Sequence, residues 1–335
     1  MSSEPRVAYV CSPDLIRVSS LLPSNRNRSA LVHTLVSAYG LLKRANCILV
    51  KPGKASRRDL ERYHEAGYLD YALQPHRDDE TGKGNVTEFG LEDDCEVFPG
   101  LDEYIYTVAA PLSQRRKPSK VQCSTWLFAG TAGAHAAGFC YVADCVLSIL
   151  QLKRPGPGQK TRPKVAYLDL DLHHGDGVAE AFSSQSLEEN QSEDSMSQGA
   201  FFRWDTDVEL EDAPKYLVVQ CGVDGLAGDP YASDAMDRSP RGGLKIVFLG
   251  GGGYNSPNAA RAWAYVTSII VGRTGQPLSI NDDIPDHSGF LKYAPSFVLD
   301  VPAGNMQDDN IEKDLEQIEN NYNVLIERIQ RAQSS

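Results

Sequence analysis

Two aspartates and a histidine recur at every second position in one short segment. The segment VAYLDLDLHH (165–174) is mostly apolar, as expected for a buried parallel strand. Because side chains alternate along a strand, Asp169, Asp171 and His173 are predicted to share the face opposite the intervening leucines. Carboxylate and imidazole groups together suit zinc or a similar divalent ion. The alternative is that the aspartates only cap the helix that follows.

Asp224 is a candidate third ligand. It ends the apolar run YLVVQCGVD, and a parallel sheet would bring it beside the first cluster. Two carboxylates and one histidine leave a coordination position for water, which is typical of catalytic zinc. The predicted metal ligands are therefore Asp171, His173 and Asp224.

A run of four glycines, 250–253, precedes Tyr254. It matches neither GxGxxG nor the phosphate-binding GxxxxGK[ST] pattern, so a nucleotide site is not favoured. We expect the loop to present the Tyr254 hydroxyl to a metal-bound carbonyl, where it would stabilise a developing oxyanion. The alternative is that Tyr254 only packs.

The elements that must position these residues predict an α/β fold with a mostly parallel central sheet flanked by helices. Apolar runs predict strands at 7–10 and 47–50 and within 164–174, 216–224 and 245–255. Helical spacing predicts helices at 30–42, 138–152, 258–270 and 310–331. We expect one domain over 1–335, with a disordered acidic, serine-rich loop at 183–214.

Composition limits the partners and the compartment. A net charge of −12 disfavours nucleic-acid binding and tolerates basic polypeptides. The seven cysteines are scattered without CxxC spacing, which argues against a disulfide framework or a four-cysteine zinc site. No run of eighteen apolar residues and no secretory leader is visible, so we expect an intracellular protein without a membrane span.

Several motifs together resemble the class I histone deacetylases: VAYLDLDLHHGDGVAEAF, GVDGLAGDP and LGGGGYN, with RSALVHTLV, YHEAGYL, GLEDDC, AAGFCYVADCVLSIL, NAARAWAYVTSIIVG and IPDH. These segments cover most of the chain. The resemblance implies the arginase-like α/β fold and a hydrolase that converts N-acetyl-lysine to lysine and acetate with zinc. It also implies Asp171, His173 and Asp224 as the zinc ligands and Tyr254 as the electrophilic tyrosine.

The resemblance extends to residues around the site. Asp94 matches a rim aspartate that holds the substrate backbone, and Gly138 and Phe139 match the wall of the acetyl-lysine tunnel. Asp169 and Asp176 resemble carboxylates that orient a catalytic histidine pair. In the family, the backbone carbonyls matching Asp169, Asp171 and His173 would line a potassium site.

The partners that the resemblance implies are acetylated histone tails or other proteins bearing acetyl-lysine. The resemblance also implies a corepressor complex as a partner, and a role in chromatin regulation and transcription repression. The implied location is the nucleus, with the cytoplasm as a second one.

The chain departs from the family where the general base should lie. Family members carry W-x-G-G-x-H-H-A before GFCY, whereas this chain reads STWLFAGTAGAHAAGFCY, in which Trp126 and Gly130 echo the pattern without the histidine pair. His135 is predicted to be a surface helix residue. His174 should face away from His173. Asp169 and Asp176 would then be left without partners.

Other segments also depart from the family. The range 183–214 is polar where relatives have strands and a helix, 105–125 is unlike the helix expected there, and the connection after Pro230 barely suffices for a parallel crossover. We therefore expect missing core elements and lowered stability.

Two alternatives to an active deacetylase remain: a binding module lacking the general base, and a manganese hydrolase such as an arginase relative or an acetylpolyamine deacetylase.

Overall fold

The computed structural model describes most of the chain. The described residues are 6–74, 87–110, 121–125, 133–182, 202–203, 215–226, 245–272, 276–302 and 304, and the single residues Lys313, Glu316, Asn320 and Asn323. For 121–125 and 202–203 only the backbone is described.

A seven-stranded sheet in the order β2-β1-β3-β7-β6-β4-β5 forms the centre of this described part. All neighbouring strands run parallel except β4 and β5. The sheet therefore confirms the predicted mostly parallel arrangement. The strands are β1 Arg6–Val10, β2 Cys47–Val50, β3 Val121–Thr125, β4 Val165–Asp169, β5 Phe202–Arg203, β6 Tyr216–Gln220 and β7 Lys245–Leu249.

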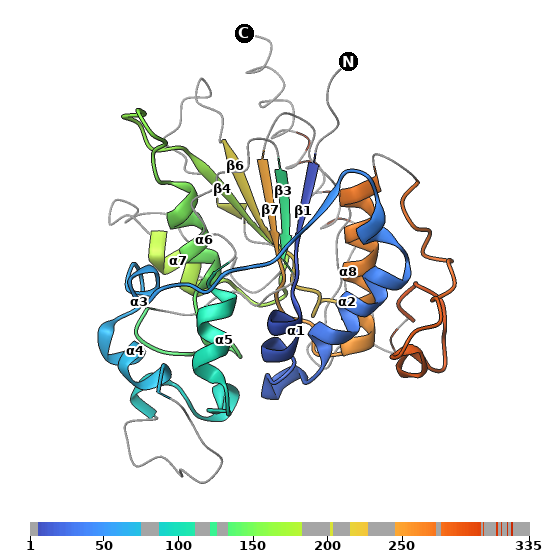
Figure 1. Ribbon diagram of the computed structural model, residues 1–335, viewed down its shortest axis with the longest axis horizontal. Coiled ribbons are helices and arrows are strands. Elements are labelled where there is room, and N and C mark those ends of the chain that lie inside the picture. Colours follow the sequence, from blue (N-terminus) through green and yellow to red (C-terminus); the bar gives the residue numbers. More distant parts are fainter. Residues whose placement is uncertain are drawn as a thin grey trace.

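Helices cover both faces of the sheet (Figure 1). Helices α2 and α8 lie on one side, and α3 to α7 lie on the other. Their bounds are α1 Pro13–Ser19, α2 Arg28–Ala38, α3 Arg57–Leu60, α4 Ala66–Ala72, α5 Leu101–Val108, α6 Asp144–Leu152, α7 Asp176–Phe182 and α8 Ser256–Val271. Short 3-10 turns are η1 Pro23–Asn25, η2 Leu41–Lys43, η3 Thr87–Phe89, η4 Asp93–Cys95 and η7 Phe290–Tyr293.

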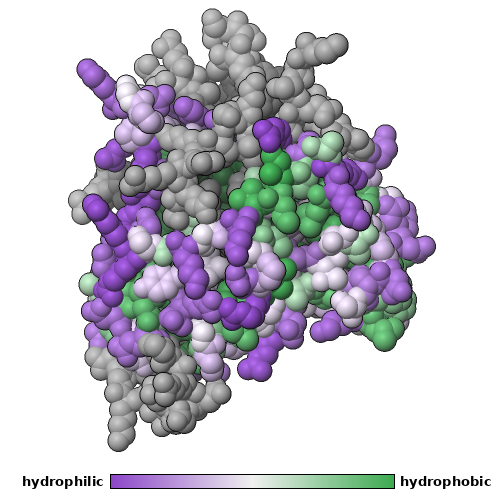
Figure 2. All heavy atoms as spheres, viewed as in Figure 1, coloured by the Kyte–Doolittle hydropathy of each residue, from purple (hydrophilic) through white to green (hydrophobic). Residues whose placement is uncertain are grey.

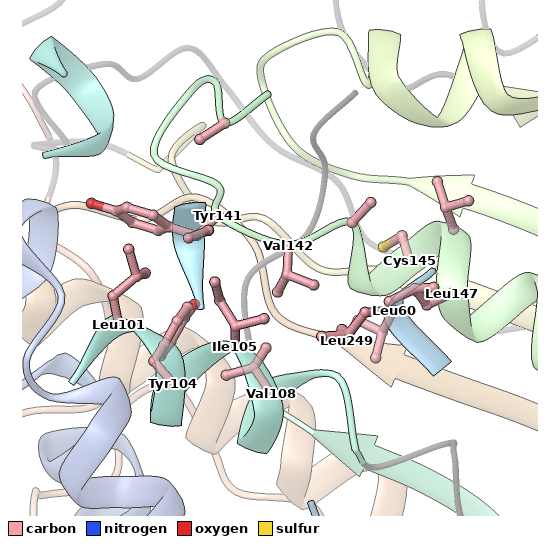
Figure 3. Packing of buried hydrophobic residues seen from close by; sticks show 14 of the residues in the cluster. Leu60, Leu101, Tyr104, Ile105, Val108, Tyr141, Val142, Cys145, Leu147 and Leu249 are labelled. Carbon is pink, nitrogen blue, oxygen red and sulfur yellow. The ribbon is translucent and has the colours of Figure 1, made fainter. Parts of the chain in front are cut away.

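Each face of the sheet has its own hydrophobic core. The core on the side of α4, α5 and α6 includes Ile105, Cys145 and Leu249 (Figure 3). The core on the side of α2 and α8 includes Val32 and Trp263. Strand β4 contributes to both, because its side chains alternate: Tyr167 packs in the first core, and Ala166, Leu168 and the following Leu170 pack in the second. This confirms the alternation predicted for the segment that carries the aspartates.

One predicted helix begins later than expected. The helix predicted at 138–152 starts at Asp144, and Ala137 and Cys140 instead pair across a tight turn. Both residues inside this turn, Gly138 and Phe139, have left-handed backbone angles, with φ of 54° and 63°. That conformation is incompatible with an α-helix, so helical spacing in the sequence was misleading here.

One strand was not predicted. Strand β3 lies centrally between β1 and β7, although its sequence VQCST is short and has only two apolar residues, Val121 and Cys123, too few to predict a strand. It falls inside the range 105–125 that we found unlike the expected helix. Within the same range, α5 continues to Val108, and residues 111–120 lie outside the described part.

Several other predictions have partial outcomes. The connection after Pro230 suffices, since β6 and β7 are parallel neighbours. Of the range 183–214, the structure describes only the two residues of β5. In the predicted helix 310–331, the four described residues are helical. The six cysteines whose side chains are described are free. No helix among the described residues has the length and hydropathy needed to cross a membrane.

Polar side chains predominate in the coloured part of the face seen in Figure 2, and its largest apolar area lies in the upper half, right of centre.

Candidate metal centre

The three predicted ligands meet at the carboxyl ends of β4 and β6. One ligand atom from each of Asp171, His173 and Asp224 lies within 4.8 Å of the others. The two strands are adjacent, with Asp169 of β4 opposite Gln220 of β6, so the residues that follow each strand emerge side by side. Asp224 is fully buried, Asp171 is half-buried and His173 is exposed. The cluster is therefore buried at Asp224 and exposed to solvent at His173.

Local hydrogen bonds hold the ligands beyond the end of β4. Oδ1 of Asp169 accepts a hydrogen bond from the backbone N–H of Asp171 at 3.1 Å, and Oδ1 of Asp171 accepts one from the N–H of His173 at 3.1 Å. The N–H of Leu172 donates to Oδ1 of Asp224 at 3.1 Å. These bonds turn the chain so that Asp171 and His173 stay on one side, although the strand itself ends at Asp169.

The carboxylates favour positive charge at His173. Its Nδ1 lies 3.3 Å from Oδ1 of Asp171 and 2.8 Å from Oδ2 of Asp224. The hydrogen bond with Asp171 contributes most and, with Asp224, raises the pKa of His173 to about 9. The position between the two carboxylates thus stabilises a cation.

The two carboxylates themselves carry opposite pKa shifts. Burial raises the pKa of Asp224, and the neighbouring charge of Asp171 adds to the shift. Burial also opposes ionisation of Asp171, but hydrogen bonds, first from His173, outweigh it and hold the pKa of Asp171 below its usual range. Two adjacent, largely buried carboxylates are costly without a compensating cation. Their chemistry and that of the imidazole therefore fit a divalent metal ion.

The glycine loop closes over these carboxylates. The N–H of Gly252 donates to Oδ2 of Asp171 at 2.8 Å. A Cβ on Gly252 would overlap the carboxylate of Asp224, so no larger residue fits without a shift. This close approach explains the glycine requirement better than a phosphate site would.

A buried arginine, which we did not single out from the sequence, supports the same loop. Arg28 donates hydrogen bonds to the carbonyl oxygens of Gly253 at 2.6 Å and Gly251 at 3.1 Å. Its guanidinium lies 4.7 Å from the ring centre of Trp263 in α8. Arg28 thus joins the start of α2 to the loop that leads into Tyr254.

Tyr254 lies between this loop and α8. The side chain of Asn255 caps α8 by accepting a hydrogen bond from the N–H of Asn258 at 3.2 Å, which fixes the residue after Tyr254. The Tyr254 ring lies 4.9 Å from that of Phe139. Burial, followed by the charges of nearby acidic groups, raises the pKa of Tyr254 well above its usual range. Its hydroxyl therefore stays protonated and can donate a hydrogen bond.

The residues predicted to contact substrate lie in two segments that contact each other. Phe139 is half-buried, and Gly138 and Asp94 are exposed. Tyr141, which follows the turn holding Gly138 and Phe139, contacts the segment after Asp94, because its hydroxyl donates to the carbonyl oxygen of Glu96 at 2.7 Å. Tyr141 also packs in the first hydrophobic core (Figure 3). The segment that follows Phe139 is therefore anchored to the interior.

His64 is a second supporting residue that we did not single out. Its Nε2 accepts a hydrogen bond from the N–H of Ala143 at 3.0 Å, so its Nδ1 carries the proton and donates to the carbonyl oxygen of Gly133 at 3.1 Å. One buried imidazole thus ties together both ends of the segment that contains Phe139. Single histidines carry no sequence pattern that would reveal such a role.

The prediction that Asp169 and Asp176 are left without partners is wrong. The Tyr167 hydroxyl donates to Oδ2 of Asp169 at 2.8 Å, and the N–H of Gly177 donates to Oδ1 of Asp176 at 2.7 Å. Tyr167 lies two positions before Asp169 and so shares its face of β4. Burial raises the pKa of Asp169 to about 7.

Two further histidines considered from the sequence, His135 and His174, are exposed. His135 is on the surface, as predicted, but it lies in a bend rather than a helix, because α6 begins only at Asp144. Trp126 and Gly130 lie outside the described residues.

Comparison with known proteins identifies relatives over nearly the whole chain. A family model described as the histone deacetylase domain matches residues 22–192. The chain is 32% identical to Histone deacetylase 8 of Danio rerio, with 93% of each chain covered. It is 30% identical to Histone deacetylase 8 of Xenopus tropicalis, over 92% of this chain and 95% of the relative.

The first alignment spans 365 positions, more than the 335 residues of this chain, so some residues of the relative fall opposite gaps in this chain. This agrees with the predicted loss of internal segments. The match of the family model and the two nearly full-length relatives show that the chain belongs to the histone deacetylase family, as its class I motifs predicted.

Proposed function

We propose that this protein is a zinc-dependent deacetylase that hydrolyses N-acetyl-lysine in histone tails or other proteins. The observation that carries the proposal is the convergence of Asp171, His173 and Asp224 within 4.8 Å, at the carboxyl ends of parallel strands. Family membership supports the same reaction. Two carboxylates and one imidazole are a ligand set of catalytic rather than structural zinc.

Asp171, His173 and Asp224 would hold the ion, which when bound would polarise the acetyl carbonyl and activate water. Tyr254 would donate a hydrogen bond to the oxygen on which negative charge develops. Phe139 and Gly138 would line the path of the acetyl-lysine side chain, and Asp94, which is exposed, would hold the substrate backbone.

The proposed mechanism lacks an assigned general base to take a proton from the attacking water. No adjacent histidine pair precedes GFCY in the sequence. Loss of a general base costs a factor of about 10² to 10⁴ in rate, so Tyr254 and the metal would support slow turnover. The absence of the histidine pair favours a second candidate, a deacetylase-like module that binds acetyl-lysine without hydrolysing it.

The wider setting follows from the family. We propose that residues 1–335 form one deacetylase domain that acts in chromatin regulation and transcription repression, in the nucleus or the cytoplasm. A corepressor complex would be its assembly partner. A potassium ion held by the backbone carbonyls of Asp169, Asp171 and His173 belongs to the same proposal.

Two measurements on the zinc-supplied protein separate the candidates. Isothermal titration with an acetyl-lysine peptide, against the same peptide unacetylated, measures recognition. Release of acetate measures hydrolysis. Selective binding with acetate release supports the deacetylase, and selective binding without it supports the binding module. Equal affinity for both peptides, without acetate release, would contradict both.

A further inference from the structure

Gln220, the last residue of β6, reaches from its strand to a proposed metal ligand. Its Nε2 donates a hydrogen bond to Oδ2 of Asp171 at 2.9 Å. The residue is only 4% exposed, and it lies opposite Leu249 of β7 as well as Asp169 of β4. A buried amide in the middle of a parallel sheet needs a polar partner, and here that partner is the carboxylate.

The orientation of this amide is fixed by its surroundings. The backbone N–H of Gly222 donates to Oε1 of Gln220 at 2.5 Å, so Oε1 must accept and Nε2 must face Asp171. A Cβ on Gly251 would lie 2.5 Å from Nε2, so the glycine loop leaves space for the amide and for nothing larger. The Nε2 donor of Gln220 is therefore directed toward Asp171.

The Asp171 carboxylate is consequently held from two sides. Its Oδ2 accepts from Gln220 and from the N–H of Gly252, while its Oδ1 faces His173. Because both donors act on one oxygen, they set the rotation of the carboxylate and strengthen its ionised form. Hydrogen bonds of this kind orient metal ligands and tune their affinity for the ion.

We propose that Gln220 is a positioning residue of the metal centre: it fixes the rotation of the Asp171 carboxylate and thereby raises the affinity of the site for a divalent ion. The inference rests on the proposed function. It concerns metal binding rather than turnover, so it can be tested whether or not the protein is active.

The test is metal affinity in Gln220→Met, which keeps the side-chain length but removes the donor. Co²⁺ binding is measured by competition with a chromophoric chelator, and the visible absorption of bound Co²⁺ reports ligand geometry. We expect affinity to fall about 10- to 100-fold with a changed spectrum. Gln151→Met is the matched control, since Gln151 lies on α6, where its Oε1 accepts a hydrogen bond from Arg62. It should match the parent.

Gln220→Glu provides a second, nearly isosteric variant. An ionised carboxylate there cannot donate to Asp171 and would repel it, so the rotation of the Asp171 carboxylate and with it the spectrum of bound Co²⁺ should change. A merely structural role would lower folding stability in both variants but leave the affinity and spectrum of the folded protein unchanged.

Co²⁺ affinity within about twofold of the parent in Gln220→Met, with an unchanged spectrum, would overturn the inference and leave the proposed function intact. Failure of the parent to bind Co²⁺ or Zn²⁺ would overturn both. The two failures are thus distinguished by the parent protein alone.

Discussion

The guanidinium of Arg28 donates a hydrogen bond of 2.6 Å to the carbonyl oxygen of Gly253, the residue immediately before Tyr254. Gly253 has a φ of 127°, a backbone conformation that L side chains rarely adopt. Arg28 therefore holds the loop at Gly253, the residue with this rare backbone conformation. The position of the Tyr254 hydroxyl depends on a residue far away in the sequence.

Replacement of Arg28 by methionine should destabilise the fold and displace Tyr254. The carbonyl oxygens of Gly251 and Gly253 would lose their donor, at about 1–3 kcal/mol for each buried group. Urea denaturation measures this loss. Arg17→Met is the control, because Arg17 makes an exposed ion pair with Glu103 and should change stability by less than about 1 kcal/mol. Equal effects of the two substitutions would contradict the role of Arg28.

Gly252→Ala should abolish metal binding. The added Cβ would overlap the Asp224 carboxylate and crowd that of Asp171, so the ligands would have to separate. Metal content after dialysis against zinc measures the effect. Gly67→Ala is the control, since Gly67 lies in α4 and the nearest atom to its added Cβ is 3.8 Å away. Retention of one zinc per chain in Gly252→Ala would show that the loop does not constrain the site.

Metal should stabilise the folded protein through Asp224. Binding to the folded state alone adds about 2.7 kcal/mol at a metal concentration 100 times Kd, and a chelator should remove that gain. Asp224→Asn weakens the ligand set and should reduce the rise in Tm caused by zinc. Differential scanning calorimetry with zinc and with chelator provides the comparison. An equal rise in the parent and in Asp224→Asn would place the bound ion elsewhere.

Acid should destabilise the fold through two buried histidines. Burial lowers the pKa of His33 and His64 to about 4, against about 6.5 in an unfolded chain. Between these values the unfolded chain binds more protons, so the free energy of unfolding falls as pH drops from about 6.5 to about 4. Each histidine contributes on the order of 3 kcal/mol to this fall.

His33→Phe isolates one of these contributions from carboxylates that titrate in the same range, such as Asp169. Denaturant unfolding of parent and variant across this pH range gives the two slopes. The variant should lose less stability than the parent on acidification. Parallel pH profiles would show that His33 is not held neutral by burial.

The sequence was informative where the structure depends on local periodicity. Alternation along 165–174 predicted that Asp171 and His173 lie together, and parallel topology brought Asp224 to them. Short apolar runs likewise predicted strands β1, β2, β4, β6 and β7. Strand β3 was missed because VQCST has only two apolar residues, and its central position follows from pairing with β1 and β7.

The supporting contacts could not be predicted because they join distant segments. Arg28, His64 and Gln220 each bond to backbone or side-chain atoms far along the chain. No spacing within the sequence indicates that a single arginine, histidine or glutamine is buried. The left-handed turn at Gly138 and Phe139 was likewise hidden, because the surrounding residues have helical spacing.

The sharpest test of the proposed metal centre is acetate release from an acetyl-lysine peptide by protein stripped of metal and then reloaded with zinc. We expect no release after stripping, measurable release after reloading, and loss of that release in Tyr254→Phe with zinc still bound. Release that survives stripping, or that is unchanged in Tyr254→Phe, would contradict a metal centre in which Asp171, His173 and Asp224 act with Tyr254.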